Sequence, residues 1–290
     1  MSQLAANVFY SFTLQSLLAT AFFIWFRPTR YFHATHAMIA PLGAYAAIYL
    51  WGAETGWVAL VSALAGATLT AAAMGVAVEA LYARLGGGRD RPLVILVVSL
   101  AIYAIAQNVL AIAFGERIVR WPALADAQAV STMGVELSVT QVVAAGVAIA
   151  AVVAIWCWWE LSAAGRTARA LSDNPELADI VGVDTRAISR AFAAISAGCA
   201  GLAGVLIVLD VGVTPSEGFN LLIPAITAVL LSGARSISGV VTGAALVATL
   251  QGTTAFLLGS KWEDFVVYAL LAAILVARPL GLQSNATREA

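Results

Sequence analysis

The sequence predicts an all-α polytopic membrane protein with eight or nine transmembrane helices, and two observations carry that prediction. Hydrophobic residues make up 61% of the 290 residues and charged residues only 11%, whereas a soluble domain carries about 25% charged residues. The apolar residues also gather into nine stretches bounded by charges, glycine or proline, and most can cross a hydrocarbon core of about 30 Å. We therefore expect a single transmembrane domain over residues 1–290. The net charge of −1 argues against a nucleic-acid partner.

We expect one helix in each apolar stretch. The stretches cover residues 8–26, 31–50, 57–82, 92–114, 139–160, 190–210, 219–232, 237–258 and 264–278. The first lacks a basic flank and a small-residue cleavage site, so we expect it to be kept as a helix. The seventh is short and contains Pro224. In an alternative arrangement with eight spans, this segment is broken or re-entrant.

When all nine stretches are treated as full spans, most basic side chains fall on one side of the membrane. Twelve arginines fall on one side, and Arg117, Arg120 and Lys261 fall on the other. Positive residues concentrate in cytoplasmic loops, so the N-terminus is expected outside, and the C-terminus and the loop 161–189 in the cytoplasm. The re-entrant alternative would place Arg278 outside, and this favours nine spans.

A polar stretch at Gly165–Arg190 contains a short predicted helix. Asn174 is a suitable N-cap, Pro175 fits the first helical position, and Gly182 is the expected left-handed stop. Glu176 suits the positive N-terminal end of the helix.

One face of this short helix is apolar, because Leu177, Ile180 and Val181 recur at helical spacing. A helix of roughly seven residues is unstable alone in water. It is therefore either a connector resting on its own protein or lipid headgroups, or a knob that inserts into a groove on a soluble partner.

The second apolar stretch is the most polar of the nine. His36, Ala40 and Gly43 share one helix face, and Pro41 interrupts the helix. A kinked helix with a small, partly polar face suits a translocation path. Alternatively, His36 and the nearby His33 are hydrogen-bonding groups at the cytoplasmic interface.

Small residues mark the expected helix contacts. Gly239 and Gly243 form a GxxxG pair, and Gly198, Gly201 and Gly204 give the sixth stretch a narrow face. Such faces let helix backbones approach closely in lipid, so we interpret them as packing surfaces.

The sequence contains no motif for phosphate binding, hydrolysis or zinc binding. The only lysine, Lys261, belongs to no phosphate-binding loop, and no hydrolase or zinc motif occurs. Two histidines without nearby acids or cysteines make a poor metal site. Acids are scarce inside the spans, which counts against an ion-coupled carrier without excluding it. We expect no catalytic residues, no metal and no cofactor in this chain.

The segment from Arg169 to Val208 resembles the branched-chain amino acid ABC importer permeases of the LivH-like family. The residues that match in order are Arg169, Ala170, Asp173, Glu176, Ala178, Gly182, Gly201, Ala203 and Gly204. Further matches are His36, Gly43-Ala44-Tyr45, Glu79, the turn Leu231–Gly239 and Arg278-Pro279-Leu280-Gly281. Ser232, Arg235 and Ser238 depart from the two glycines and the proline of the family's turn, and Met38, His33 and Thr35 also depart from its pattern.

The resemblance implies a heteromeric importer in the bacterial inner membrane. Its partners would be a second related permease, two ABC ATPase subunits that bind ATP and Mg, and a periplasmic binding protein. The short helix would then be a coupling helix docked on an ATPase, with Arg169, Asp173, Glu176, Leu177, Ile180, Val181 and Gly182 as coupling residues. The expected path residues are His36, Ala40, Gly43, Gly233 and Arg235.

Three questions stay open at the level of sequence: the solute, the role of Arg235 and the class of transporter. The transported solute would be a hydrophobic amino acid by default, although the wider family also takes urea, short amides and small organic acids. Arg235 either reaches the cytoplasmic interface or lies at the inner mouth of the path, where it would favour an anionic solute. An ion-coupled secondary transporter is the alternative function.

Overall fold

A computed structural model describes most of the chain as helices. The described residues are 2–29, 31–85, 91–121, 130–132, 135–173, 180, 182 and 184–277. The helices are α1 (Ser2–Thr29), α2 (His36–Trp51), α3 (Trp57–Tyr82), α4 (Arg91–Phe114), α5 (Val139–Leu161), α6 (Ala163–Asp173), α8 (Thr185–Asp210), α9 (Gly218–Leu231), α10 (Ile237–Leu258) and α11 (Glu263–Ala277). Two 3-10 turns, η1 (Pro215–Glu217) and η2 (Ser260–Trp262), and one antiparallel hairpin, β1 (Val130–Thr132) with β2 (Val135–Leu137), complete the described elements.

The predicted all-α membrane fold is confirmed. Six helices of the described part are long and apolar enough to cross a membrane: α1, α3, α4, α5, α8 and α10. The helices α2, α9 and α11 have 16, 14 and 15 residues, or about 21–24 Å at 1.5 Å per residue. Each of the nine predicted stretches thus holds a helix, three of them shorter than a full span.

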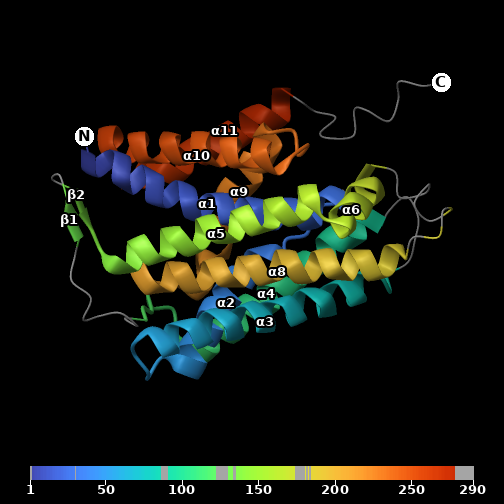
Figure 1. The fold of residues 1–290 in the computed structure, drawn as a ribbon, viewed down its shortest axis with the longest axis horizontal. Coiled ribbons are helices and arrows are strands. Elements are labelled where there is room, and N and C mark those ends of the chain that lie inside the picture. The colour runs from blue at the N-terminus through green and yellow to red at the C-terminus, as the bar shows by residue number, and fades with distance from the viewer. Residues whose placement is uncertain are drawn as a thin grey trace.

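The helices run between two ends of the molecule, which we call the hairpin end and the α6 end (Figure 1). At the hairpin end, the Gln3 side chain accepts a hydrogen bond from the backbone of Glu136, and Val119 pairs with Val213. At the α6 end, Arg27 bonds both Asp173 and the backbone carbonyl of Ala234.

The seventh segment crosses the molecule although its helix is short. Val213 lies at the hairpin end and Ala234 at the α6 end. Between them, η1 precedes α9, so only the second part of the crossing is α-helical. This course fits the arrangement with nine crossings and differs from the re-entrant alternative.

The centre of the bundle is formed by α1 and α8. In these two helices, 72% and 78% of the most apolar window is buried inside the chain, compared with 22–28% for α3, α4 and α5. Glycines permit the close contacts of α8. A Cβ atom added at Gly204 would lie 1.9 Å from the carbonyl oxygen of Ala40, and one at Gly43 would lie 2.6 Å from Cα of Gly201. The predicted packing role of the sixth-stretch glycines is confirmed.

The helix α6 was not predicted, because its residues fell within the polar stretch. Ser162 begins it by accepting a hydrogen bond from the Gly165 N–H at 2.8 Å, as an N-cap does. Ala168 and Leu171 are buried on its inner face. The next helix, α8, begins at Thr185 rather than at the expected residue 190, because Asp184 caps it through the Ala187 N–H at 2.9 Å.

Candidate functional site

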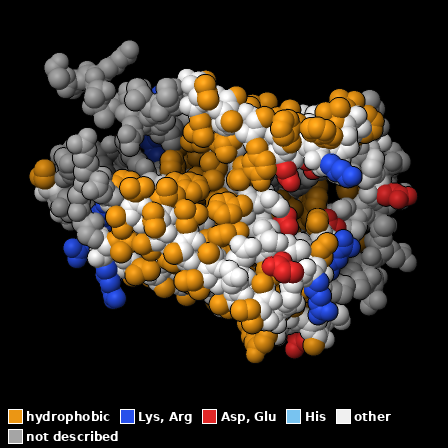
Figure 2. Space-filling model, turned by 180° about the vertical axis from the view of Figure 1, so that it is seen from behind, with side chains coloured by type: hydrophobic (Ala, Val, Ile, Leu, Met, Phe, Trp, Pro, Cys, Tyr) orange, Lys and Arg blue, Asp and Glu red, His pale blue; other side chains and the backbone are white. Residues whose placement is uncertain are grey.

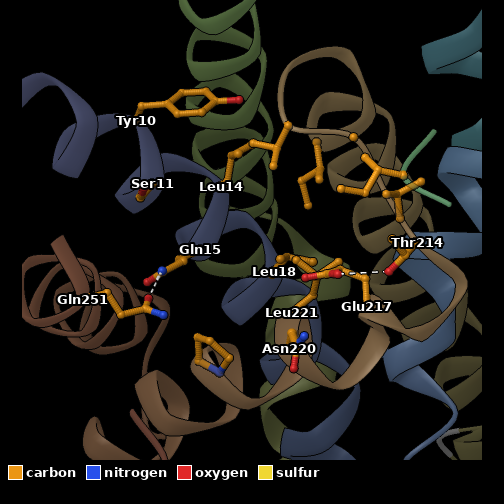
Figure 3. Close-up of a pocket in the computed structure, with 16 residues that line it drawn as sticks. Tyr10, Ser11, Leu14, Gln15, Leu18, Thr214, Glu217, Asn220, Leu221 and Gln251 are labelled. Atoms are coloured by element: carbon orange, nitrogen blue, oxygen red, sulfur yellow. Dashed lines mark hydrogen bonds between the residues drawn. The ribbon is translucent and has the colours of Figure 1, made fainter. Parts of the chain in front are cut away.

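A cavity of about 300 Å³ lies in the hairpin-end half of the bundle and is hereafter called the vestibule (Figure 3). Its walls come from α1, Ile118, the end of α8, the segment Val211–Thr214, η1, α9 and α10. The volume is at the lower end of the range for small-molecule sites. On the face seen in Figure 2, acidic and basic side chains both lie around a hollow near this end of the molecule.

Helical spacing brings side chains of α1 and α9 to the vestibule. From α1 come Tyr10, Leu14 and Leu18, four residues apart, and Ser11 and Gln15 lie beside them on the same face. The α9 side contributes Glu217, Asn220, Leu221 and Pro224, which follow the same helical period. The cavity therefore has a polar part and an apolar part.

Two hydrogen bonds order the polar part of the vestibule. Thr214 Oγ1 donates to Glu217 Oε2 at 3.1 Å. Gln15 Nε2 donates to Gln251 Oε1 and so joins α1 to α10. The oxygen Oε1 of Gln15 is buried and has no hydrogen-bond donor among the described residues. A buried acceptor without a donor is costly, so a ligand that donates a hydrogen bond would be favoured here.

A second, smaller cavity of about 10 Å³ lies deeper in the bundle, and we call it the inner chamber. His36, Ala37 and Ala40 line it from α2. Leu18 and Leu221 line both the vestibule and the inner chamber, so these two side chains form the constriction between them. The inner chamber has room for about one water molecule.

His36 is the polar side chain of the inner chamber. Only 3% of it is exposed, and neither ring nitrogen has a hydrogen-bond partner among the described residues. The ring packs edge-on against Phe22, with the centroids 5.5 Å apart. His33 is fully buried as well, 4.2 Å from the Trp25 ring. Both histidines are therefore enclosed by the protein and have little exposed surface.

Of the five predicted path residues, the structure brings His36 and Ala40 to a cavity. Gly43 instead packs against the Gly201 backbone and lines neither the vestibule nor the inner chamber. Gly233 and Arg235 lie in the turn between α9 and α10 at the α6 end, and Arg235 is exposed. Neither residue lines the vestibule or the inner chamber.

The family model for the branched-chain amino acid transport system permease component matches residues 4–275. The chain belongs to this family. It is 28% identical over 258 residues to the high-affinity branched-chain amino acid transport system permease protein LivH of Escherichia coli (strain K12), covering 85% of this chain and 83% of the relative. It is 26% identical over 259 residues to BraD, the high-affinity branched-chain amino acid transport system permease protein of Pseudomonas aeruginosa, covering 85% and 84%. No solved structure matches.

Two of the coupling residues expected in this permease hold α6 against the bundle. Arg169 donates to the carbonyl oxygen of Trp159 and lies 3.4 Å from the Glu160 carboxylate at the end of α5. Asp173 pairs with Arg27 of α1 at 2.6 Å. In the structure these two side chains therefore bind to other parts of this chain.

The remaining coupling residues are described only in part. Ile180 is 80% exposed, and Gly182 has φ +83°, the left-handed conformation predicted for the helix stop. Glu176, Leu177 and Val181 lie outside the described residues.

The sequence reasoning missed the polar residues of the vestibule. A signal was present, because Gln15 and Gln251 each stand within a long apolar stretch, and polar residues inside membrane spans often mark a solute pathway. Glu217 gave no such signal, because it precedes a short span and resembles an ordinary loop acid.

Proposed function

We propose that this permease provides the transmembrane path of a binding-protein-dependent ABC importer for branched-chain or other hydrophobic amino acids. The family match over residues 4–275 carries this proposal, and the relatives named above carry the solute class in their names. The vestibule supports it, since Leu14, Leu18 and Leu221 offer an apolar surface for an aliphatic side chain.

The proposed complex gives this chain four kinds of contact. A second related permease would complete the membrane part, and two ABC ATPase subunits would bind ATP and Mg and hydrolyse the ATP, so this chain needs no cofactor. A periplasmic binding protein would deliver the solute, and lipid would surround α3, α4 and α5, whose windows are mostly unburied.

The proposed orientation follows from charge. Arg27, Arg166, Arg169, Arg186 and Arg190 all lie at the α6 end, which the positive-inside rule assigns to the cytoplasm. The hairpin end and the vestibule would then face outward, toward the binding protein, with the N-terminus outside and the C-terminus inside.

In this orientation, transport would begin with the vestibule open outward and the constriction at Leu18 and Leu221 closed. Solute would enter from the binding protein and rest on the apolar wall. Closure of the ATPase pair would shift the α6 end, and the constriction would open toward His36 and the α6 end. The permease itself would supply the path and the alternation of access.

The test measures uptake of radiolabelled leucine by proteoliposomes that contain the purified complex. The cognate binding protein is added to the assay. We expect uptake that requires ATP and the binding protein. Uptake by the permease alone, driven by an ion gradient without ATP, would identify an ion-coupled carrier instead.

The coupling role has a separate test at Ile180, which is 80% exposed at the α6 end. The variant Ile180→Asp places a charge on the proposed docking face, so ATPase assembly or ATP-driven uptake should fall at least about tenfold, as loss of a buried interface anchor does. The control Ala164→Asp adds the same charge at an exposed position of α6 and should retain uptake. Normal uptake by the Ile180 variant contradicts docking through this face.

A further inference from the structure

We propose that the vestibule recognises the protonated amine of the solute through Glu217, so that the permease selects ammonium-bearing solutes over organic anions of the same size. This inference rests on the proposed function and deepens it by naming the group that the path recognises. It concerns the vestibule residues alone.

Glu217 is held in place but not neutralised. It ends η1, directly before α9, and Thr214 donates to its Oε2 atom at 3.1 Å. In the described part of the chain, no other donor bonds this carboxylate, and no arginine or lysine pairs with it. Figure 3 shows Glu217 beside Thr214 and close to Leu18 and Leu221. A fixed carboxylate with a free oxygen is an acceptor for a charged donor.

The rest of the polar lining of the vestibule also favours a ligand that donates hydrogen bonds. Gln15 Oε1 is buried without a partner among the described residues. No arginine or lysine lines the vestibule. An ammonium group carries three donors, whereas an organic anion carries only acceptors. An anion would therefore meet the Glu217 carboxylate, while Arg120, which borders the lining, has its Nε bonded to the Val211 carbonyl oxygen at 2.8 Å.

The apolar wall lies next to the carboxylate. Leu14, Leu18, Leu221 and Pro224 line the same cavity as Glu217. A solute with a charged amine and a small aliphatic body could therefore bind the carboxylate with its amine and contact the apolar wall with its aliphatic part at the same time. This pairing of one charge with an apolar wall is typical of sites that fix the orientation of a small ligand.

The charge of the hairpin end points to the same solute class. Its described acids outnumber its described bases, with Glu54, Glu116, Glu136, Asp210, Glu217, Glu263 and Asp264 against Arg117, Arg120 and Lys261. An acidic mouth raises the local concentration of cationic groups and lowers that of anions. The anionic-solute interpretation of Arg235 gains no support here, because Arg235 lies at the other end.

The experiment measures binding of tritiated leucine to the purified complex without ATP and without the binding protein. Two competitors share the leucine skeleton: isopentylamine lacks the carboxylate, and isocaproate lacks the amine. We expect isopentylamine to compete and isocaproate to fail. In Glu217→Gln, which keeps the shape and removes the charge, the affinity for leucine and isopentylamine should fall at least about tenfold, as the loss of a charge-assisted hydrogen bond predicts.

The matched control is Glu54→Gln, which removes an exposed acid at the same end outside the vestibule lining. Its affinity for leucine should stay within about twofold of the unaltered protein, because the charge of an exposed carboxylate is screened by salt. Elution as a single species and an unchanged thermal midpoint would show that Glu217→Gln remains folded.

Three results would overturn the inference: equal affinity in Glu217→Gln, competition by isocaproate as strong as by isopentylamine, or no saturable binding of leucine in the millimolar range. These outcomes are separate from the proposed function. ATP-driven uptake in the proteoliposome assay would stand even if Glu217 played no part in recognition.

Discussion

At the scale of single residues, Arg27 joins three parts of the permease. Its guanidinium pairs with Asp173 at the end of α6 at 2.6 Å and donates to the Ala234 carbonyl at 2.8 Å. It therefore links α1 to α6 and to the turn between α9 and α10. A planar guanidinium has enough donors in a fixed geometry to serve both partners, which a lysine ammonium does less well.

Removal of this link should destabilise the permease more than removal of the ion pair alone. In Arg27→Gln, the Ala234 carbonyl and Asp173 both lose their charged donor, so the free energy of unfolding should fall by about 1.5 kcal/mol. In Asp173→Asn the loss should be smaller, roughly 0–1 kcal/mol, because the Asp173 side chain is 66% exposed. Thermal midpoints in detergent measure both.

Arg186→Gln is the control, because Arg186 is exposed and forms no ion pair in the described residues. Its midpoint should match that of the unaltered protein. Equal midpoints for Arg27→Gln and Arg186→Gln would show that the link carries no stability.

In the turn that follows α9, the left-handed backbone conformation falls on other residues than expected. Arg235 was expected to occupy a position that favours glycine, but the left-handed residues are Gly233, at φ +69°, and Ala234, at φ +49°. The Gly233 N–H bonds the Leu230 carbonyl and the Ala234 N–H bonds the Val229 carbonyl. This pair of bonds is a Schellman motif. The strain falls on Ala234, and Arg235 continues to the surface.

At the scale of elements, glycines set how closely α2 approaches α8. A Cβ at Gly43 would lie 2.6 Å from both Cα and O of Gly201. Because these are backbone atoms, no side chain can move aside to relieve the contact. The two helices would have to separate, and α2 also carries the inner-chamber residues His36 and Ala40.

Gly43→Ala should therefore lower stability by about 1–3 kcal/mol, the usual cost of overpacking a well-packed contact. Gly146→Ala in α5 is the matched control, since a Cβ there meets nothing within 4 Å. Alanine is favoured over glycine inside a helix by up to about 1 kcal/mol, so this variant should be neutral or more stable. Thermal midpoints of opposite sign are the expected result, and a stabilised Gly43 variant would contradict the contact.

At the scale of the whole molecule, the two ends carry opposite charge. Described bases at the α6 end are Arg27, Arg84, Arg91, Arg166, Arg169, Arg186, Arg190 and Arg235. The described acids outnumber the described bases at the hairpin end. This asymmetry supports the proposed orientation and places the amine-recognising carboxylate at the outer mouth.

Cysteine labelling tests the orientation. In a Cys157→Ala, Cys199→Ala background, we expect a membrane-impermeant maleimide to label Glu136→Cys at the hairpin end in intact spheroplasts. Arg186→Cys at the α6 end should be labelled only after permeabilisation. Both side chains are exposed in the structure, so access is decided by the side of the membrane. The reverse pattern would invert the proposed topology.

The sequence by itself determined the membrane class, the nine apolar segments and the small-residue packing faces. These follow from composition, run length and helical periodicity, which are local properties of the chain. The left-handed stop at Gly182 was likewise predictable, because glycine adopts φ +83° without a steric penalty.

Only the tertiary structure decided where polar groups meet. Gln15 and Gln251 are 236 residues apart in sequence yet form one hydrogen bond, and no periodicity within one helix specifies its neighbour. The same holds for the salt bridge between Arg27 and Asp173, which are 146 residues apart in sequence. The vestibule exists because α1, η1, α9 and α10 leave a space between their faces. Such a space is a property of packing across helices, which local patterns do not encode.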